Sequence, residues 1–168
     1  IAQVASSGEL EIVGTGVQPS LGMRKGLVVD LEEMQAAINQ SVDKASRFIS
    51  PDRALPGACI GVTGTHILSL QSDGSLNNVN GGDNKIISHK ELAMVVKQSY
   101  PKVGPGQELL HVIPQTYKVD SLQGVRNPTG LKGHQLSVKS HIVIGEAASL
   151  DNVVRAVEGA GLTVKSMV

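Results

Sequence analysis

The chain has 168 residues, enough for one domain or two small ones, and a chain of this length buries about 70% of its unfolded surface without disulfide staples. Fifteen basic residues balance fifteen acidic ones, so the net charge creates no long-range field that would attract nucleic acid or anionic lipid. No Trp, two Tyr and one Phe are too few for a base-stacking platform, and we expect no nucleic-acid partner.

The single cysteine and the length of the apolar runs indicate the cellular compartment of the protein. Cys59 lies in the run ACIGV, so we predict a buried, inert thiol and a reducing, cytoplasmic environment. No apolar run approaches the roughly 18 residues of a membrane-spanning helix, and we expect neither a span nor a signal peptide. The chain opens on Ile1 inside an apolar run and closes on GLTVKSMV, so we expect a segment of a longer protein.

The N-terminal third predicts two strands and a helix. Ile1–Ala5 and Glu9–Val17 flank a short Gly-containing turn, the pattern of a β-hairpin. A loop at residues 18–29 leads to Asp30, which has the position of a helix N-cap with an acidic residue at the capping-box position, Glu33. Apolar residues then recur at helical spacing: Leu31, Met34, Ile38, Val42, Ala45 and Ile49. We expect Pro51 to end this helix.

The middle of the chain predicts one or two buried strands, a flexible excursion from them and a second helix. Residues 58–70 indicate one or two buried strands, interrupted at Gly61 and Gly64. Residues 71–83 are polar and rich in Gly, Asn and Ser, so they predict a flexible excursion. Ser88, followed by Glu91, predicts the cap of a second helix that ends before Pro101. Its expected inward side comprises Leu92, Val95, Val96 and Ser99.

Leu109–Val119 and Gln135–Gly145 predict two long strands joined by an arm rich in Gly, Pro and Asn. Pro114 breaks the alternation of the first strand, which indicates an edge or a bulge. The second strand alternates cleanly, so we expect a hairpin-like pair with one covered face, a pattern typical of a binding module. A third helix should begin at Ser149 or Asp151 with Leu150, Val153, Val154 and Val157 inward, stop at Gly161 and lead to a last strand.

The sequence shows no motif for nucleotide, metal or nucleophilic chemistry. GxxxxGK[ST] is absent, and Gly14-Thr15-Gly16 opens no helix, so we expect these glycines to let a strand bend. The five histidines lack HxxxH and HExxH spacing, although His111 and His141 on the two long strands could lie near each other. There is no GxSxG elbow, and the carboxylates gather at helix starts. We therefore expect no catalytic, cofactor-binding or metal-binding residue.

Several segments in order resemble the FtsA family, the actin-like bacterial cell-division proteins. They are IVGTGVQPSLGMRKGLVVDLEEMQAAI, GVTGTHI, ISHKEL, HVIPQTYKVDSLQGVRNPTG and VKSHIVIG. Each segment alone is weakly specific, but their order and spacing extend over nearly the whole chain. The pilus-assembly actin homologue PilM, which carries a similar insert, is a more distant resemblance.

The FtsA resemblance implies an α/β (α+β) fold, in which a partial actin/ribonuclease-H-like subdomain carries an inserted strand-helix-strand-strand (SHS2) module. Residues 1–64, with the closing strand 162–168, correspond to part of subdomain 1A, and residues 65–161 correspond to subdomain 1C. The same resemblance places one phosphate-binding loop before Ile1 and another after Val168. ATP and Mg²⁺ are thus expected of the full-length family, and we expect no cofactor and no enzyme activity in this segment.

The resemblance also implies a function in protein–protein interaction. It implies self-association with FtsA itself, recruitment of FtsN-type division proteins, and contact with FtsZ through another part of the parent protein. The parent is expected at the cytoplasmic face of the inner membrane at the division septum, with no direct membrane contact by this segment. Two alternatives stay open, a PilM-like pilus-assembly scaffold and a part of an actin-like ATPase whose catalytic loops lie outside the chain.

Three polar segments are candidate partner-binding sites. The loop Met23–Gly26, with Arg24 and Lys25, is either a solvated turn or, by the resemblance, a contact with a neighbouring subunit. The arm from Arg126, Asn127 and Pro128 to Lys132 has few apolar residues, so we expect no core there, and it is either a hairpin tip or a docking surface. With the helix face carrying His89, Lys90 and Lys97, the arm borders a sheet edge. Such edges also invite strand addition by a peptide or a second copy.

Overall fold

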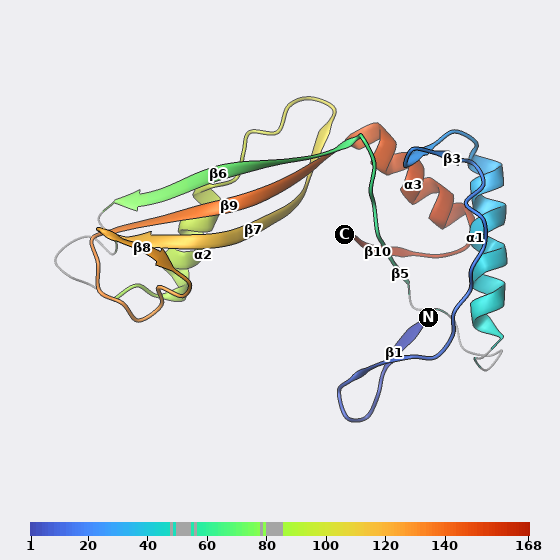
Figure 1. Cartoon of the computed structure of the whole chain (residues 1–168), viewed down its shortest axis with the longest axis horizontal. Coiled ribbons are helices and arrows are strands. Elements are labelled where there is room, and N and C mark those ends of the chain that lie inside the picture. Colours follow the sequence, from blue (N-terminus) through green and yellow to red (C-terminus); the bar gives the residue numbers. More distant parts are fainter. Residues whose placement is uncertain (48, 50–54, 56, 78, 80–85) are drawn as a thin grey trace. The chain divides into compact units, whose positions relative to one another are not determined.

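The computed structural model describes residues 1–47, 49, 55, 57–77, 79 and 86–168. These residues form two compact units. Unit 1 comprises Ile1–His66 with Ala147–Val168, and unit 2 comprises Ile67–Glu146. Helices and β-sheets occur together, which confirms the predicted mixed α/β class (Figure 1). The third helix lies in unit 1 by these contacts, and the subdomain boundary at residue 161 stays a prediction.

Unit 1 consists of short strand pairs and two helices. Its elements are β1 (Ala2–Val4), β2 (Leu10–Ile12), β3 (Met23–Arg24), β4 (Leu27–Val28), α1 (Leu31–Ser46), β5 (Ala58–Ile60), α3 (Ala147–Gly159) and β10 (Val164–Met167). β1 and β2 form the predicted antiparallel hairpin, although β2 is shorter than expected. The predicted loop at residues 18–29 is wrong in part, because β3 and β4 form a second hairpin there. Its turn places Lys25 and Gly26 at positive φ.

Helices α1 and α3 pack together and form the core of unit 1. The Asp30 carboxylate accepts a hydrogen bond from the backbone N–H of Glu33 at 2.9 Å, as the predicted N-cap requires. Met34 of α1 is buried with two residues of α3, Val153 and Ala156. Ala156 is therefore buried where Val154, which is only half-buried, was predicted. α3 also begins at Ala147, earlier than predicted, because the preceding strand runs into it without a loop.

The prediction of a buried thiol at Cys59 is wrong, since Cys59 is exposed. β5 pairs only with β10 in the described part of the chain, so this parallel sheet has two strands. Successive side chains along a strand point to opposite faces. Ile60 packs against the core of unit 1, and Cys59 therefore points to the other face.

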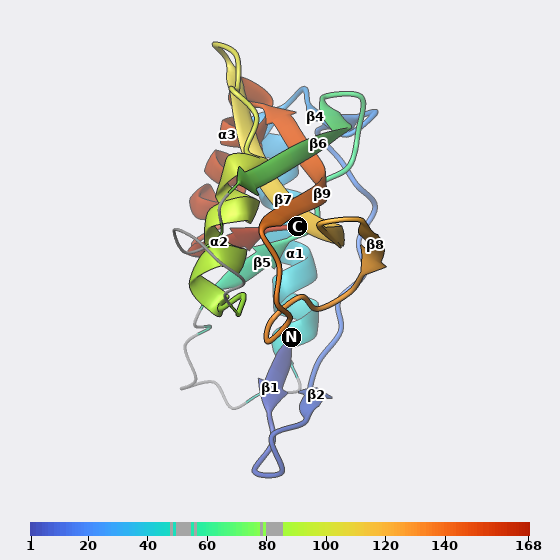
Figure 2. The same cartoon turned by 90° about the vertical axis from the view of Figure 1, so that its left-hand side faces the viewer.

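The described residues of unit 2 form a four-stranded antiparallel sheet with one helix on one face. Its elements are β6 (Ile67–Asn77), α2 (His89–Gln98), β7 (Gln107–Val119), β8 (Leu122–Val125) and β9 (Gln135–Glu146), and the strand order is β6-β9-β7-β8. Figure 2 shows α2 beside β6 and β9, with β8 at the opposite edge of the sheet. The predicted pairing of the two long strands is confirmed as the β7–β9 pair. Its joining arm, however, contains β8, which was not predicted.

The predicted flexible excursion at residues 71–83 is wrong over residues 71–77, which all pair with β9. Gln71, Asp73 and Ser75 alternate with residues that face α2, so their polarity marks the solvent side of a strand. Residues 78 and 80–83 of that prediction lie outside the described residues, and Val79 is buried.

Alternation along β9 separates a core face from an open face. Leu136, Val138, Ser140 and Ile142 are almost completely buried on the face toward α2, whereas Ser137, Lys139 and His141 lie on the other face. Ser88 and Glu91 form the predicted capping box at the start of α2. At the end of α2, the buried Ser99 hydroxyl lies 2.8 Å from the buried hydroxyl of Ser140, so a polar pair links the helix to the sheet.

Pro114 lies at an irregularity of β7, as predicted. The register of β7 against β9 shifts between Pro114 and Thr116. β8 pairs with β7 only at Tyr117 and Val119, so Pro114 also lies on a part of β7 that has no second neighbour within the described residues. A proline removes one ladder hydrogen bond and is tolerated at such positions.

Gly74 of β6 allows α2 to approach the sheet. A Cβ atom at this position would lie 2.3 Å from the carbonyl oxygen of Val95 and 2.8 Å from the amide nitrogen of Ser99. Both are backbone atoms of the helix, which cannot move away without displacing α2. Glycine is therefore required here by packing.

We predict that Gly74→Ala lowers the free energy of unfolding of unit 2 by about 1–3 kcal/mol, because the added methyl group overpacks the helix–sheet contact. Urea denaturation followed by circular dichroism measures the change. Gly104→Ala is the matched control, since its Cβ would meet only the side chain of Gln107, at 3.4 Å. Equal losses in the two variants would contradict the packing argument.

Asp120 closes the arm between β7 and β9. One oxygen of its carboxylate accepts hydrogen bonds from the backbone N–H groups of Gln135, at 2.8 Å, and His134, at 3.0 Å. These two donors hold the pKa of Asp120 below its ordinary value of 3.8. A lowered pKa in the folded state means that the carboxylate stabilises the fold above the unfolded pKa, and that this stabilisation is lost as the pH falls through the folded pKa.

We predict that Asp120→Asn lowers the free energy of unfolding at pH 7, and that the gap in this free energy between the variant and the parent narrows as the pH falls below 3.8 and through the lower pKa of the folded protein. Thermal unfolding at pH 7, 5 and 3 measures the gap, and an NMR titration of the Asp120 carboxyl should give a pKa below 3.8. A gap that stays constant down to pH 3 would show that the charge has no part in closing the arm.

Candidate functional site

The arm after β8 folds back against the segment that precedes α2. The backbone N–H of Ile87 donates to the carbonyl of Leu131 at 2.8 Å, and the N–H of Gly130 donates to the carbonyl of Ile87 at 2.9 Å. Ile86 and Lys132 form the next antiparallel bridge. The arm is thus a hydrogen-bonded element and not a free hairpin tip.

A tight turn fixes the start of this element. The side-chain oxygen of Asn127 accepts from the backbone N–H of Thr129 at 3.1 Å, and the N–H of Leu131 donates to the carbonyl of Pro128 at 3.0 Å. Pro128 is completely buried, so the expectation of an arm without core residues is wrong at this position. The buried Pro128 ring anchors the arm, while Asn127 before it is exposed and Thr129 after it is half-buried. The Thr129 hydroxyl is buried and has no hydrogen-bond partner among the described residues.

The structure brings five of the predicted residues to the same part of unit 2. Arg126, Asn127 and Lys132 are exposed on the arm, and His89 and Lys90 are exposed in the first turn of α2, next to the Ile86–Lys132 bridge. We call this set the arm surface. It carries three permanent cations, and Glu91, the nearest carboxylate along α2, is buried and bonded to Ser88. The arm surface is therefore cationic.

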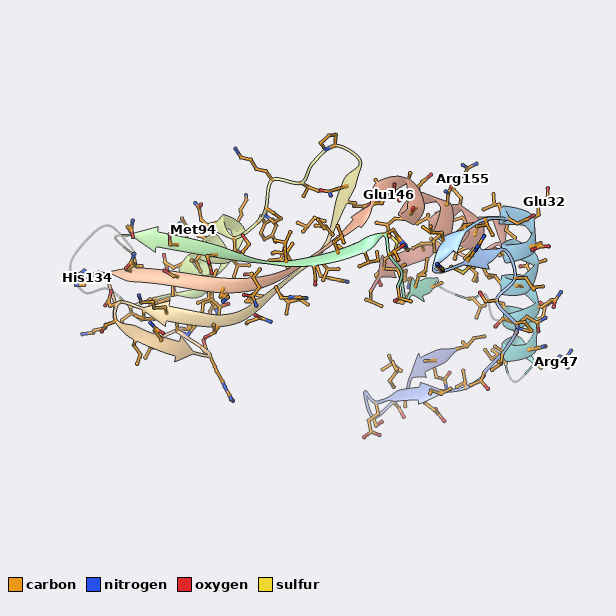
Figure 3. All side chains as sticks on the ribbon, turned by 45° about the horizontal axis from the view of Figure 1, so that its top comes forward. Glu32, Arg47, Met94, His134, Glu146 and Arg155 are labelled. Carbon is orange, nitrogen blue, oxygen red and sulfur yellow. The ribbon has the colours of Figure 1, made fainter. Side chains whose placement is uncertain are left out.

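The remaining predicted residues lie elsewhere. Lys97 is exposed, but it is seven residues after Lys90 on α2, roughly 10 Å farther along the helix axis. Arg24 and Lys25 are exposed at the β3–β4 turn of unit 1. Figure 3 shows His134 at the end of the sheet where β9 begins; this exposed residue also borders the arm.

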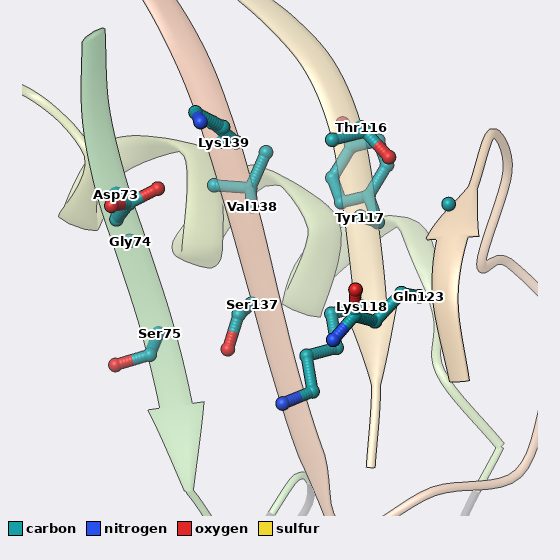
Figure 4. Close-up of a pocket in the computed structure, with 11 residues that line it drawn as sticks. Asp73, Gly74, Ser75, Thr116, Tyr117, Lys118, Gln123, Ser137, Val138 and Lys139 are labelled. Carbon is teal, nitrogen blue, oxygen red and sulfur yellow. The ribbon is translucent and has the colours of Figure 1, made fainter. Parts of the chain in front are cut away.

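The open face of the sheet carries a shallow groove of about 380 Å³ that was not predicted as a site. Figure 4 shows polar side chains from four strands around it: Asp73 and Ser75 of β6, Ser137 and Lys139 of β9, Thr116 and Lys118 of β7, and Gln123 of β8. Asp73 lies opposite Lys139 across the β6–β9 pair. Alternation of polar residues along three strands is the sequence signal that marks this face.

Neither the groove nor the strands around it hold a metal cluster. No group of three or more metal-ligating side chains occurs among the residues that the structure describes. His111 lies opposite Val143, and His141 lies opposite Ile113, so the two histidines occupy neighbouring strands two positions apart. Burial raises the pKa of Tyr117, whose hydroxyl therefore stays protonated at neutral pH.

Unit 1 contains an apolar cavity of about 580 Å³. Its lining includes Met23, Met34, Ile38, Ile60, Val153 and Val157, together with His66. His66 is buried, and neither ring nitrogen has a hydrogen-bond partner among the residues that the structure describes. The described residues around this cavity include no carboxylate and no cysteine, and its polar side chains are those of Ser20, Lys25, Thr63 and His66.

A separate observation concerns the helices. In the described part of the chain, no helix has both the length and the apolar character needed to cross a bilayer.

Comparisons with known proteins agree with this architecture. Residues 64–144 match the model of the SHS2 domain inserted in FtsA, which includes nearly all of unit 2. The cell division protein FtsA of Pseudomonas aeruginosa and that of Escherichia coli K12 are each 30% identical to the chain, over 100% of this chain and 39% of their own length. FtsA of Neisseria meningitidis serogroup B is 30% identical over 96% of the chain and 38% of its own length. The chain thus spans about two-fifths of these relatives.

A solved structure, the PilM-PilN type IV pilus biogenesis complex, is similar with a TM-score of 0.55 at 15% sequence identity, over 99% of this chain and 42% of that chain. At this identity the likeness shows a shared fold alone. The FtsA likeness, in contrast, lies in the sequence itself and extends beyond the inserted domain to the elements of unit 1. The chain belongs to the FtsA family of actin-like cell-division proteins and carries the SHS2 domain that is inserted in them.

Proposed function

We propose that this chain is a protein–protein interaction module of bacterial cell division, which binds later division proteins of the FtsN type and contributes to self-association of its parent protein. The observation that supports this function is the arm surface, where exposed cations lie on a backbone held by the Ile87–Gly130 and Ile87–Leu131 hydrogen bonds. The names of the relatives, all cell division protein FtsA, support the cellular process.

The arm surface suits binding because its backbone is ordered before a partner arrives. A buried Pro128 and the turn at Asn127 fix the arm, so a partner need not order it, and this reduces the entropic cost of association. Arg126, Lys132 and Lys90 supply charge that steers a partner segment carrying carboxylates. Arg126 also offers a planar pair of donors to one carboxylate.

Catalysis has no part in the proposed function of this segment. ATP and Mg²⁺ would be bound by the parent protein, and FtsZ would be contacted by another part of it. We place the parent at the cytoplasmic face of the inner membrane at the septum, where a cationic surface could meet the cytoplasmic segments of division proteins. A PilM-like scaffold role is the second candidate, supported by the similarity of fold.

We predict that Arg126→Glu with Lys132→Glu weakens capture of the purified cytoplasmic segment of an FtsN-type protein by roughly tenfold or more. Both side chains are exposed, so the free energy of unfolding should stay within about 0.5 kcal/mol of the parent chain. Biolayer interferometry measures the affinity, and urea denaturation measures the stability.

Lys102→Glu with Arg155→Glu is the matched control, because it makes the same change of charge at two exposed positions outside the arm surface. This control should bind like the parent chain. If the two double variants bind equally, the arm surface has no specific part in the interaction, and the proposed function loses its main support.

A further inference from the structure

The edges of the sheet in unit 2 are protected to different degrees. At one edge, β8 has four residues, and the adjoining free part of β7 carries Pro114 and two register shifts. Short strands, prolines and bulges are the devices by which proteins prevent an edge from pairing with another strand. At the other edge, β6 pairs with β9 over eleven residues without a shift and contains one charged residue, Asp73, and no proline. β6 is therefore an unprotected edge.

The outer side of β6 is available for pairing. Among the described residues, the only strand that pairs with Ile67–Asn77 is β9. On the face toward α2, this edge has two different halves. α2 covers Gly74, and Leu76 packs against the core, whereas the side chains of Leu68 and Leu70 are 54% and 38% exposed. One half thus has a helix above it, and the other half has uncovered leucines.

We propose that β6 pairs antiparallel with β6 of a second copy of this chain, about a two-fold axis at Ser72. This proposal deepens the function proposed above, because it assigns self-association to a surface other than the arm surface. The pairing would join two four-stranded sheets into one sheet of eight strands. A two-fold interface closes on itself, so its product is a dimer and not a filament.

The sequence of β6 is self-complementary in this register. Leu70 lies opposite Gly74 of the second copy, and Leu68 lies opposite Leu76 of the second copy, so each uncovered leucine meets the half that carries the helix. Cross-strand neighbours share one face of a sheet. The helix above this half, α2, contacts β6 and carries Met94, an apolar side chain that is 46% exposed.

Charge opposes the pairing only weakly, because the two Asp73 carboxylates lie at diagonal positions about 7–8 Å apart and each has Lys139 opposite it on β9. Asp73 is the only charged residue of β6, and in this register it lies opposite Gln71 of the second copy. Like charges directly opposite each other would destabilise the pair, and none occur. A second copy thus places apolar residues beside the leucines on one face of β6 and a neutral residue beside Asp73 on the other. An extended peptide of another protein would need the same order of apolar and neutral residues.

The most direct test is a cross-link at the two-fold axis. Ser72→Cys in a Cys59→Ser background should form a disulfide-linked dimer under mild oxidation, because residues directly opposite in an antiparallel pair have Cα atoms about 4.5–5.5 Å apart, within disulfide range. Ser69→Cys is the matched control. Its two copies would lie six positions apart along the strand, roughly 20 Å, and should not cross-link.

Leu70→Lys tests the same interface without cysteine. Because Leu70 is partly exposed in the single chain, the variant should fold. The dissociation constant of its dimer, measured by sedimentation equilibrium, should be roughly tenfold or more above that of the parent. Leu122→Lys on β8 is the control and should dimerise like the parent. A parent chain that is monomeric at all concentrations, or equal cross-linking at positions 72 and 69, would overturn the proposal.

Two further outcomes separate this proposal from the one above. If Arg126→Glu with Lys132→Glu loses the FtsN-type segment but still dimerises, the arm surface and the β6 edge act independently, as we expect. If the FtsN-type segment protects the amides of β6 and no β6 dimer is found, the edge takes a peptide, and pairing with a second copy is wrong.

Discussion

The close contact between α2 and the sheet determines the surfaces of unit 2. Gly74 leaves room for the helix backbone above β6, and the buried Ser99 and Ser140 hydroxyls join the end of the helix to β9. A single helix of ten residues covers only part of an eleven-residue strand. Leu68 and Leu70 of β6 therefore stay exposed on this face, and Lys139 of β9 is exposed on the other. The length and position of this helix leave the two leucines at the start of β6 uncovered.

The same helix organises the arm. Its capping box at Ser88 orders the segment before α2, and the backbone of Ile87 in that segment bonds residues 130 and 131. The chain thus uses one short segment twice, to begin a helix and to hold a loop. Cations on such a loop keep a defined spacing, and this makes a basic stretch specific for a partner. The position of α2 thus bears both on the arm surface and on which half of β6 is covered.

Local signals in the sequence predicted the elements that local physics determines. The caps at Asp30 and Ser88, the alternation of β9 and the bulge at Pro114 all depend on neighbours in the chain, and the structure has them. The exposure of Cys59 and the burial of Pro128 depend on which distant segment covers each residue, which composition does not record. Residues 71–77 were mistaken for a loop because an edge strand with one solvent face is polar. Of the candidate site, the sequence indicated the cations but not the groove, whose residues come from four strands.

The central claim is that the surfaces of unit 2, and not the cavity of unit 1, carry the interactions of this chain. Amide hydrogen exchange resolved along the chain tests this claim directly, with the protein alone at low and high concentration and with an FtsN-type segment added. The account predicts that higher concentration slows exchange in residues 67–77, and that the added segment slows exchange in residues 86–90 and 126–132. Protection confined to the residues around the unit 1 cavity, or to the open face of the sheet, would contradict it.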